Sequence, residues 1–532
     1  MGKETKYNNL DKSAAYGKLT ELAPQGKNFD FKNFLTAERV KDACIPIGET
    51  LAYNWAAKSV NKEILDALQC LADEQELIPK YRDLLEGAVM NPSENRLVLH
   101  HLLRSPDAKA ITGKSVAHNG EDLGEFYLAQ LKKVYKFADK VRSEGRYTNF
   151  VQIGIGGSDL GPRAFAIALK NWAAGEGKEA YRTEFISNVD PDDAAAITES
   201  LPLDKTLFIL VSKSGTTIET LTNELFVKEK LTKAGLDPAD HMVAVTSQTS
   251  PLAKNKGYLA SFYFDDFIGG RYSVCSPVGA LILSLAYGSE VFREFLVGAN
   301  EADIAALEPC IRKNAALLDA LIGIWERNFL NYPCSAILPY SQALLRFTAH
   351  IQQLDMESNG KSVNRSKEPI AYPTGPVIFG EPGTNGQHSF YQLLHQGTDI
   401  IPLQFIGFKE SQRKDDITIK NSTSQTKLNA NLAAQITAFA NGQEDLADKN
   451  KHFAGGRPSS LIYGERLTPK ALGALLAHYE NKVMFQGFAW NLNSFDQEGV
   501  QLGKTLAGKV LSKTGSGSGD SVLDAYSDIF GI

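Results

Sequence analysis

Five hydroxyl side chains fall within nine residues at one junction, in the sequence SKSGTTIET that starts at Ser212. They are Ser212, Ser214, Thr216, Thr217 and Thr220, and they follow an apolar run that predicts a buried strand and precede a helical run. A helix N-terminus offers unpaired N–H groups and a partial positive charge, so hydroxyls gathered there can bind several oxygens of a phosphate group. Helix capping is the alternative, but it needs a single hydroxyl. Because no Walker pattern is present, we predict a site for a monophosphate rather than for a nucleoside triphosphate.

A glycine-rich turn precedes this junction, in the sequence GIGGSDLGP at residues 154–162. Its glycines let backbone N–H groups approach an anion, and Gly157 and Ser158 are the residues that we expect beside one. The turn does not fit the dinucleotide-binding fingerprint, because Asp159 stands where GxGxxG requires its last glycine. A tight strand-to-helix turn without a ligand explains the same residues, so this stretch alone leaves both interpretations open.

Two further stretches carry groups suited to moving a proton or stabilising a charge. Arg271 follows two glycines, of which Gly270 can bring the backbone close to a ligand, and an arginine keeps its charge. Glu357 continues the apolar stripe of a helical run and shares a face with Gln353, four residues earlier. A carboxylate in line with a buried stripe can serve as a general base. Taken singly, a turn arginine in solvent and a helix-end glutamate facing water are the commoner outcomes.

Two more candidates lie later in the chain. His388 falls in the glycine-rich loop FGEPGTNGQH, where a helix starts, and can be an acid–base group or a packed or capping histidine. His395, seven residues on, does not make a zinc motif with it. Ser494 and Gln497 have capping-box spacing, which predicts a helix that starts there and places Gln497 on one face with Lys504. Lys504 aimed inward would be an acid or an anion partner, although the default for a lysine is the surface.

The elements that must position these groups form two sets of alternating strands and helices. Residues 1 to 115 are expected to be helices and loops. The first set of predicted strands is 150–155, 183–187, 206–212, 241–247 and 261–264. After a helical region at 285–330, the second set is 335–340, 375–380, 400–408 and 459–464. This alternation is typical of parallel α/β sheets, whose ligands lie outside the carboxyl ends of the strands.

We therefore predict an α/β protein with two doubly wound αβα domains. The predicted limits are an N-terminal helical segment (1–115) packed on the larger domain, a first, smaller domain (116–285), a second, larger domain (286–510) and a C-terminal tail (511–532). The tail contains a Gly/Ser joint before a short apolar segment. It is either an arm that packs on a neighbour or a frayed end.

Composition narrows the class of protein. The chain has 532 residues, of which 43% are hydrophobic and 22% charged, and its net charge of −6 argues against a nucleic-acid-binding surface. The five cysteines are scattered without CxxC or Cys/His clusters, so we expect no disulfide framework and no metal site. The polar N-terminus lacks a signal-peptide core, and no apolar run reaches membrane-spanning length. These features predict a cytoplasmic protein that binds no membrane.

Together and in this order, the motifs resemble the phosphoglucose isomerase family over nearly the whole chain, up to Val510. The most specific stretches are GGRYSVCSPVG and GALLAHYENKVMFQGFAWNLNSFDQEGVQLGK, supported by IGIGGSDLGP, SKSGTTIET, QQLDMESNGK and GEPGTNGQHSFYQLLHQG. The resemblance is to this family itself and not only to the wider group that shares the SIS fold. It implies SIS-type domains, no cofactor, and reversible isomerisation of glucose 6-phosphate and fructose 6-phosphate through a cis-enediol.

The resemblance also implies a role for each motif. Glu357 would move the proton between C1 and C2, and Arg271 would stabilise the negative charge of the intermediate. His388, with Lys504, would assist opening of the sugar ring, and family members are homodimers in which the histidine loop reaches the site of the other subunit. The residues implied to bind the phosphate or line the site are Gly157, Ser158, Ser212, Lys213, Ser214, Thr217, Thr220, Gly270, Gln353 and Gln497.

Other functions are compatible with part of this set of residues. A catalytically silent sugar-phosphate sensor would keep the hydroxyl-rich loop and could lose the base, arginine, histidine or lysine, yet all four are present. An isomerase that also accepts mannose 6-phosphate is compatible with the same residues. A nicotinamide dehydrogenase is disfavoured because the fingerprint fails. The loop departs from the bulkier, Phe-containing version of many eukaryotic family members, since Ser214 and Gly215 stand there.

Overall fold

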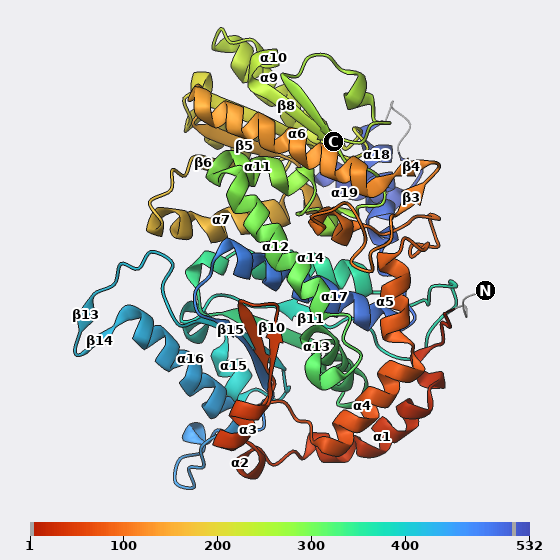
Figure 1. Cartoon of the computed structure of the whole chain (residues 1–532), viewed down its shortest axis with the longest axis vertical. Helices are drawn as coiled ribbons and strands as arrows, with labels where there is room; N and C mark the ends of the chain where they lie inside the picture. The colour runs from red at the N-terminus through yellow and green to blue at the C-terminus, as the bar shows by residue number, and fades with distance from the viewer. Residues whose placement is uncertain (1–4, 513–517) are drawn as a thin grey trace.

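The computed structural model describes residues 5–512 and 518–532 and contains two main β-sheets. In Figure 1 the first sheet lies in the upper half of the molecule and the second in the lower half, with helices α12 (Ser289–Ala305) and α17 (Pro469–Ala489) between them. These two helices pack closely through glycines. A Cβ on Gly298 or Gly473 would lie 1.8 Å from a backbone carbonyl oxygen of the opposite helix, so a larger residue would force the helices apart.

The first sheet is entirely parallel and carries the hydroxyl-rich junction. Its strands, in spatial order, are β6 (Arg182–Ile186), β5 (Asn149–Ile153), β7 (Thr206–Val211), β8 (Met242–Thr246) and β9 (Ala260–Tyr263). Every residue of β7 is buried, as expected for a central strand covered on both faces.

Helices cover both faces of this sheet. The buried clusters show that one face packs against α8 (Pro191–Glu199) and α9 (Ile218–Lys233). The other face packs against α6 (Leu123–Glu144), α7 (Leu160–Gly175) and α11 (Pro277–Tyr287). The short α10 (Pro238–His241) leads into β8. This is the doubly wound arrangement that the alternating pattern predicted.

The second sheet is mixed. Its order is β1 (Cys44–Ile47), β2 (Leu51–Asn54), β15 (Ser459–Gly464), β12 (Leu403–Phe408), β10 (Cys334–Pro339) and β11 (Val377–Phe379). The last four strands are parallel, whereas the β1–β2 hairpin joins β15 in antiparallel orientation. One face packs against α15 (Tyr391–Gln396) and α16 (Ser424–Asn441), and the other against α13 (Ala315–Ile324), α14 (Phe347–Asn359) and α17.

All nine predicted strands are present, each within three residues of its predicted ends. The expectation of only helices and loops in residues 1–115 is wrong at the β1–β2 hairpin. β1 has four residues and includes Pro46, and a proline argues against a strand when only the sequence is considered. However, β1 lies at the sheet edge, where a missing N–H donor is tolerated. The domain limits at 115, 285 and 510 stay predictions.

The remaining elements lie at the two ends of the chain and in short hairpins. The N-terminal helices are α1 (Ala14–Lys27), α2 (Phe31–Phe34), α3 (Ala37–Asp42), α4 (Lys62–Glu74) and α5 (Leu77–Leu85), and the hairpins are β3 (Ala117–His118) with β4 (Glu121–Asp122) and β13 (Thr418–Ile419) with β14 (Ser422–Thr423). At the C-terminus, α18 (Gln501–Leu511) packs against α19 (Ser521–Ile529). Within the described residues, no helix has the length and apolar character needed to cross a membrane.

Candidate active site

Loops at the carboxyl ends of β5, β7 and β9 bring together the motifs of the first sheet. The turn η3 (Gly156–Ser158) follows β5, the hydroxyl-rich loop follows β7, and η6 (Gly270–Tyr272) follows β9. A Cβ on Gly157 would lie 2.1 Å from the carbonyl carbon and oxygen of Gly270, so the two backbones meet in direct contact. Gly157 is therefore required for this contact, whatever ligand the turn holds.

The hydroxyls of the loop after β7 stabilise a turn rather than cap the helix. Ser212 Oγ accepts a hydrogen bond from the backbone N–H of Gly215 (3.1 Å), whose φ is +67°, and lies 3.3 Å from Thr217 Oγ1. Ser214 Oγ accepts from the N–H and the hydroxyl of Thr216, at 3.2 and 3.0 Å. Thr217 is the N-cap residue of α9, yet its side chain caps no backbone N–H. The positive end of α9 thus lies beside hydroxyls that do not serve as its cap.

Lys213 ties this loop to the loop after β9. Its ammonium group donates to the carbonyl oxygen of Ile268 (3.3 Å) and lies 3.7 Å from a carboxylate oxygen of Asp266. Burial lowers the pKa of Lys213 from its usual value. Thr220, one turn into α9, is buried. Lys213 therefore holds the loop after β7 against the loop after β9.

Arg271 is buried, with only 1% of its surface exposed, and most of its N–H groups bond to uncharged oxygens. Nε donates to Ser358 Oγ at 2.7 Å. Nη2 donates to the backbone carbonyls of Ser494 (2.6 Å) and Asp496 (3.1 Å). Nη1 donates to Gln497 Oε1 at 3.3 Å. The alternative of a solvent-exposed turn arginine is therefore excluded.

Glu357 lies on α14 with its Oε2 atom 3.4 Å from Arg271 Nη1. This is longer than the 2.7–2.9 Å that is typical of charge-assisted hydrogen bonds. Among the described residues, this buried oxygen accepts no hydrogen bond, and neither does Oε1 of Gln353, one turn earlier. Because buried polar atoms are nearly always paired, two unpaired acceptors side by side on one helix indicate a place for a ligand.

These two side chains line a cavity of about 960 Å³ together with Gln497. Its other walls come from residues 360–367, which follow α14, and from residues 496–500. A cavity of this volume is typical of a small-molecule site. The described residues that line it do not include the hydroxyl-rich loop, His388 or Lys504.

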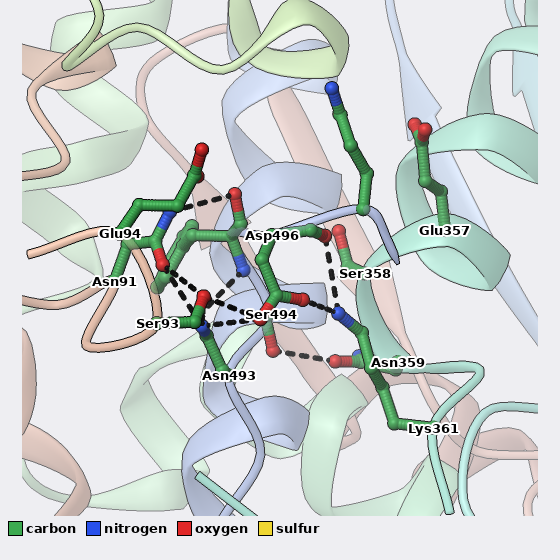
Figure 2. A network of polar contacts seen from close by, with 12 residues as sticks. Asn91, Ser93, Glu94, Glu357, Ser358, Asn359, Lys361, Asn493, Ser494 and Asp496 are labelled. Atoms are coloured by element: carbon green, nitrogen blue, oxygen red, sulfur yellow. Dashed lines mark hydrogen bonds and ion pairs between the residues drawn. The ribbon is translucent and has the colours of Figure 1, made fainter. Parts of the chain in front are cut away.

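A polar network anchors the segment that supplies the carbonyls to Arg271 (Figure 2). The side chain of Asn493 donates to Asn91 Oδ1 (3.0 Å) and to Asp496 Oδ2 (2.7 Å). Ser93 Oγ donates to the same Asp496 oxygen at 2.8 Å. Lys361 forms an ion pair with the other Asp496 oxygen and donates to its backbone carbonyl at 3.1 Å. The segment is thus fixed between the residues after α14 and the 91–94 loop.

The capping-box prediction for this segment is wrong. Ser494 Oγ donates to Asn359 Oδ1 at 2.7 Å instead of capping a helix. The helix α18 begins only at Gln501, after the short turn η12 (Glu498–Val500). Gln497 therefore lies outside the helix that carries Lys504, because its side chain and the nearby backbone are directed to Arg271.

Neither His388 nor Lys504 is among the described residues that line the cavity. His388 is exposed at the end of η10 (Asn385–His388), and Lys504 is exposed on α18. His395 is a packed residue, since its ring stacks on Phe439 with centroids 3.7 Å apart and its Nε2 lies 2.9 Å from Gln435 Oε1. Burial also lowers its pKa.

Several residues that shape the site gave no sequence signal. Ser358 and the carbonyls of Ser494 and Asp496 bind Arg271, and Lys361 holds Asp496. The one sequence feature that could indicate a polar network is the number of Asn, Ser and Asp residues at 491–496. Among the described residues, no group of three or more His, Cys, Asp or Glu side chains is arranged to hold a metal ion.

Comparisons with known proteins place this site in a family. The profile described as phosphoglucose isomerase matches residues 54–527. The glucose-6-phosphate isomerase of Treponema denticola is 60% identical over 520 residues, covering 95% of this chain and 97% of the relative. That of Treponema pallidum (strain Nichols) is 58% identical over 536 residues, covering 99% and 98%. A crystal structure of a glucose-6-phosphate isomerase from Chlamydia trachomatis superposes with a TM-score of 0.91 at 41% identity, covering 98% of this chain and 100% of that one. The chain belongs to the phosphoglucose isomerase family.

Proposed function

We infer that this protein interconverts glucose 6-phosphate and fructose 6-phosphate, in the direction of glycolysis or of gluconeogenesis. The family and the names of its relatives support this activity. The observation that carries the inference is Glu357, which lines a cavity of about 960 Å³ and lies beside the buried Arg271, with an oxygen that accepts no hydrogen bond from the described residues. Aldose–ketose isomerisation needs such a pair, because it removes a weakly acidic proton next to a carbonyl and develops negative charge on oxygen.

Glu357 is the proposed base. In the open-chain aldose it takes the proton from C2, the electrons of that C–H bond form a C1=C2 double bond, and those of the carbonyl move onto O1, which gives an enediolate. O1 takes up a proton to give the cis-enediol, and the O2 hydroxyl gives one up as the C2 carbonyl forms. Return of the proton from Glu357 to C1 completes the ketose. Arg271 provides a fixed cation for the intermediate, and it needs little reorganisation because its guanidinium is already oriented by neutral acceptors. Gln353 and Gln497 are proposed to bind the sugar hydroxyls, since both line the cavity.

The phosphate group is proposed to bind the loop after β7. The proposed donors are Ser212, Ser214, Thr217 and Thr220, with Ser158, Gly157, Lys213 and Gly270 around them. The support is a set of hydroxyls beside a helix N-terminus that no side chain caps. Binding there would fix the unreactive end of the substrate, so that C1 and C2 reach Glu357.

Ring opening is proposed to involve His388 and Lys504. His388 is exposed on its own chain and does not line its own cavity, which supports the proposal that it acts in the site of a second subunit of a homodimer. Lys504 lies on α18, which follows directly from cavity-lining residues at 497–500. We propose that Lys504 reaches the substrate from this helix.

We further propose that the enzyme works without metal or cofactor, in the cytoplasm, and binds neither nucleic acid nor membrane. The decisive test is a coupled assay of fructose 6-phosphate conversion with a chelator present. Turnover that is unchanged by the chelator is expected. Absence of turnover, with retained sugar-phosphate binding, would instead favour a sensor on the same fold. Parallel runs with mannose 6-phosphate would show how narrow the specificity is.

A further inference from the structure

The contact between Arg271 and Glu357 is looser than the two side chains allow. An arginine and a carboxylate can form two parallel hydrogen bonds of about 2.7–2.9 Å, which is the strongest pairing available to them. Here a single approach of 3.4 Å is found, although Arg271 is buried. The other hydrogen-bond acceptors of the guanidinium group therefore hold it away from the carboxylate.

Of the groups that hold the guanidinium, Ser358 is the one next to Glu357 in the chain and the one that binds Nε. Its Oγ accepts from Arg271 Nε at 2.7 Å and lies 3.0 Å from the hydroxyl of Tyr272. Arg271 and Tyr272 are adjacent in η6, and Ser358 directly follows Glu357 on α14. Arg271 and Tyr272 therefore both contact the hydroxyl of Ser358, the residue that follows Glu357. We call this three-residue contact the clamp. Because the hydrogen bond to Nε sets rotation about the Cδ–Nε bond, it fixes where Nη1 can lie.

Tyr272 is itself held rigidly. Its ring is 1% exposed and stacks on the ring of His100, with centroids 4.6 Å apart and an angle of 26° between the planes. Ser358 is fully buried. The clamp therefore belongs to the packed interior and not to a mobile loop.

We propose that Ser358, held by Tyr272, is a positioning residue that keeps the guanidinium of Arg271 from closing onto Glu357. The proposal rests on the isomerase function proposed above. With the clamp in place, Glu357 Oε2 keeps a lone pair for the substrate proton, and Arg271 still lies close enough to stabilise the enediolate. Without the Ser358 bond, the guanidinium turns about its remaining bonds to the carbonyls of Ser494 and Asp496 toward Glu357, its ion-pair partner among the described residues, and forms a tighter pair that weakens the base.

The test is the pH–rate profile of Ser358→Ala against the wild type, with fructose 6-phosphate as substrate. We expect kcat to fall by about tenfold to a hundredfold, the effect of one hydrogen bond to a charged group. KM should change little, because the phosphate binds elsewhere. The acid limb of the kcat profile should move to lower pH, because a closer cation keeps the carboxylate ionised in more acidic solution. A general loss of packing would lower kcat without moving that limb.

Two further variants make the test specific. Tyr272→Phe removes only one hydroxyl and should shift the acid limb in the same direction by less, which keeps the proposal testable if Ser358→Ala folds poorly. Ser276→Ala removes another fully buried hydroxyl, one that bonds Ser273 O and the N–H of Val278, and should leave the acid limb in place. An active wild type with an unmoved acid limb in Ser358→Ala and Tyr272→Phe would overturn the positioning role alone. An inactive wild type would overturn the isomerase function, and the positioning role with it.

Discussion

Replacement of Glu357 by glutamine tests the proposed base most directly. Glutamine keeps the shape of the side chain but can neither take a proton nor pair with Arg271. A positioned general base contributes about 10²–10⁴-fold to a rate. This factor corresponds to about 3–5 kcal/mol of activation free energy. We therefore expect kcat to fall by at least two orders of magnitude.

The same structure predicts a small effect on stability. The lost contact is a single approach of 3.4 Å to a side chain that is 21% exposed, and Arg271 keeps its bonds to Ser358 Oγ and to the carbonyls of Ser494 and Asp496. The expected loss of unfolding free energy is about 1 kcal/mol, near the upper end for partly exposed ion pairs. Activity and stability should therefore separate in this variant.

The assay measures initial rates of glucose 6-phosphate formation with a coupling dehydrogenase, and calorimetry measures binding of fructose 6-phosphate. Glu498→Gln is the matched control, because Glu498 lines the same cavity, is exposed, and should tolerate the change. If Glu357→Gln retained a kcat within tenfold of the wild type, another group would have to move the proton. If the variant lost binding together with turnover, Glu357 would be a binding group rather than the base.

The remaining predictions concern the phosphate loop, the second subunit and a buried acid. The double change Ser212→Ala, Thr217→Ala should raise KM for fructose 6-phosphate by about tenfold to a hundredfold with a smaller change in kcat, since hydrogen bonds to a charged group are lost; an unchanged KM would place the phosphate elsewhere. Mixing inactive Glu357→Gln and His388→Ala subunits under conditions that allow subunit exchange should restore about a quarter of wild-type activity. If the histidine acts across a two-fold axis, half of the dimers are mixed, and each mixed dimer has one intact site out of two. No recovery would argue that each site is built within one chain. Burial raises the pKa of Asp355 to about 7 from 3.8, so the stability that protonated Asp355 contributes at low pH is lost as the pH rises from about 4 to about 7. The free energy of unfolding, measured by urea denaturation, should therefore fall with rising pH less steeply in Asp355→Asn than in the wild type, by up to about 1.4 kcal/mol per pH unit. If the free energies of the two proteins changed with pH in parallel, the raised pKa of Asp355 would be contradicted.

Much of the fold was readable from the sequence because its signals are local. Buried parallel strands such as β7 are uninterrupted apolar runs, and such a run can be recognised in the sequence without knowing which strands lie beside it. The β1–β2 hairpin was not readable, because its place is set by pairing with β15, more than 400 residues later. Pro46 is acceptable there only because β1 forms the sheet edge.

The candidate site divides in the same way. Residue types and spacing alone identified the hydroxyl-rich loop, the glycine turn, Arg271 and Glu357 as groups capable of chemistry. Only the tertiary structure could exclude the alternatives of a helix cap and a solvent-exposed arginine. It shows that the side chain of the N-cap residue Thr217 does not cap α9 and that Arg271 is buried. Ser494 satisfied a capping pattern, yet its hydroxyl bonds Asn359, because a contact distant in sequence replaced the local one.

The sequence by itself determined which functional groups are available and, through its motifs, the family to which the chain belongs. Tertiary structure alone decided how those groups face one another: the 3.4 Å gap between Arg271 and Glu357, and the role of Ser358 in keeping it. Motifs record residue types along the chain. The reactivity of a base depends on distances and hydrogen bonds between segments such as η6 and α14, which lie far apart in sequence and meet only in the folded protein.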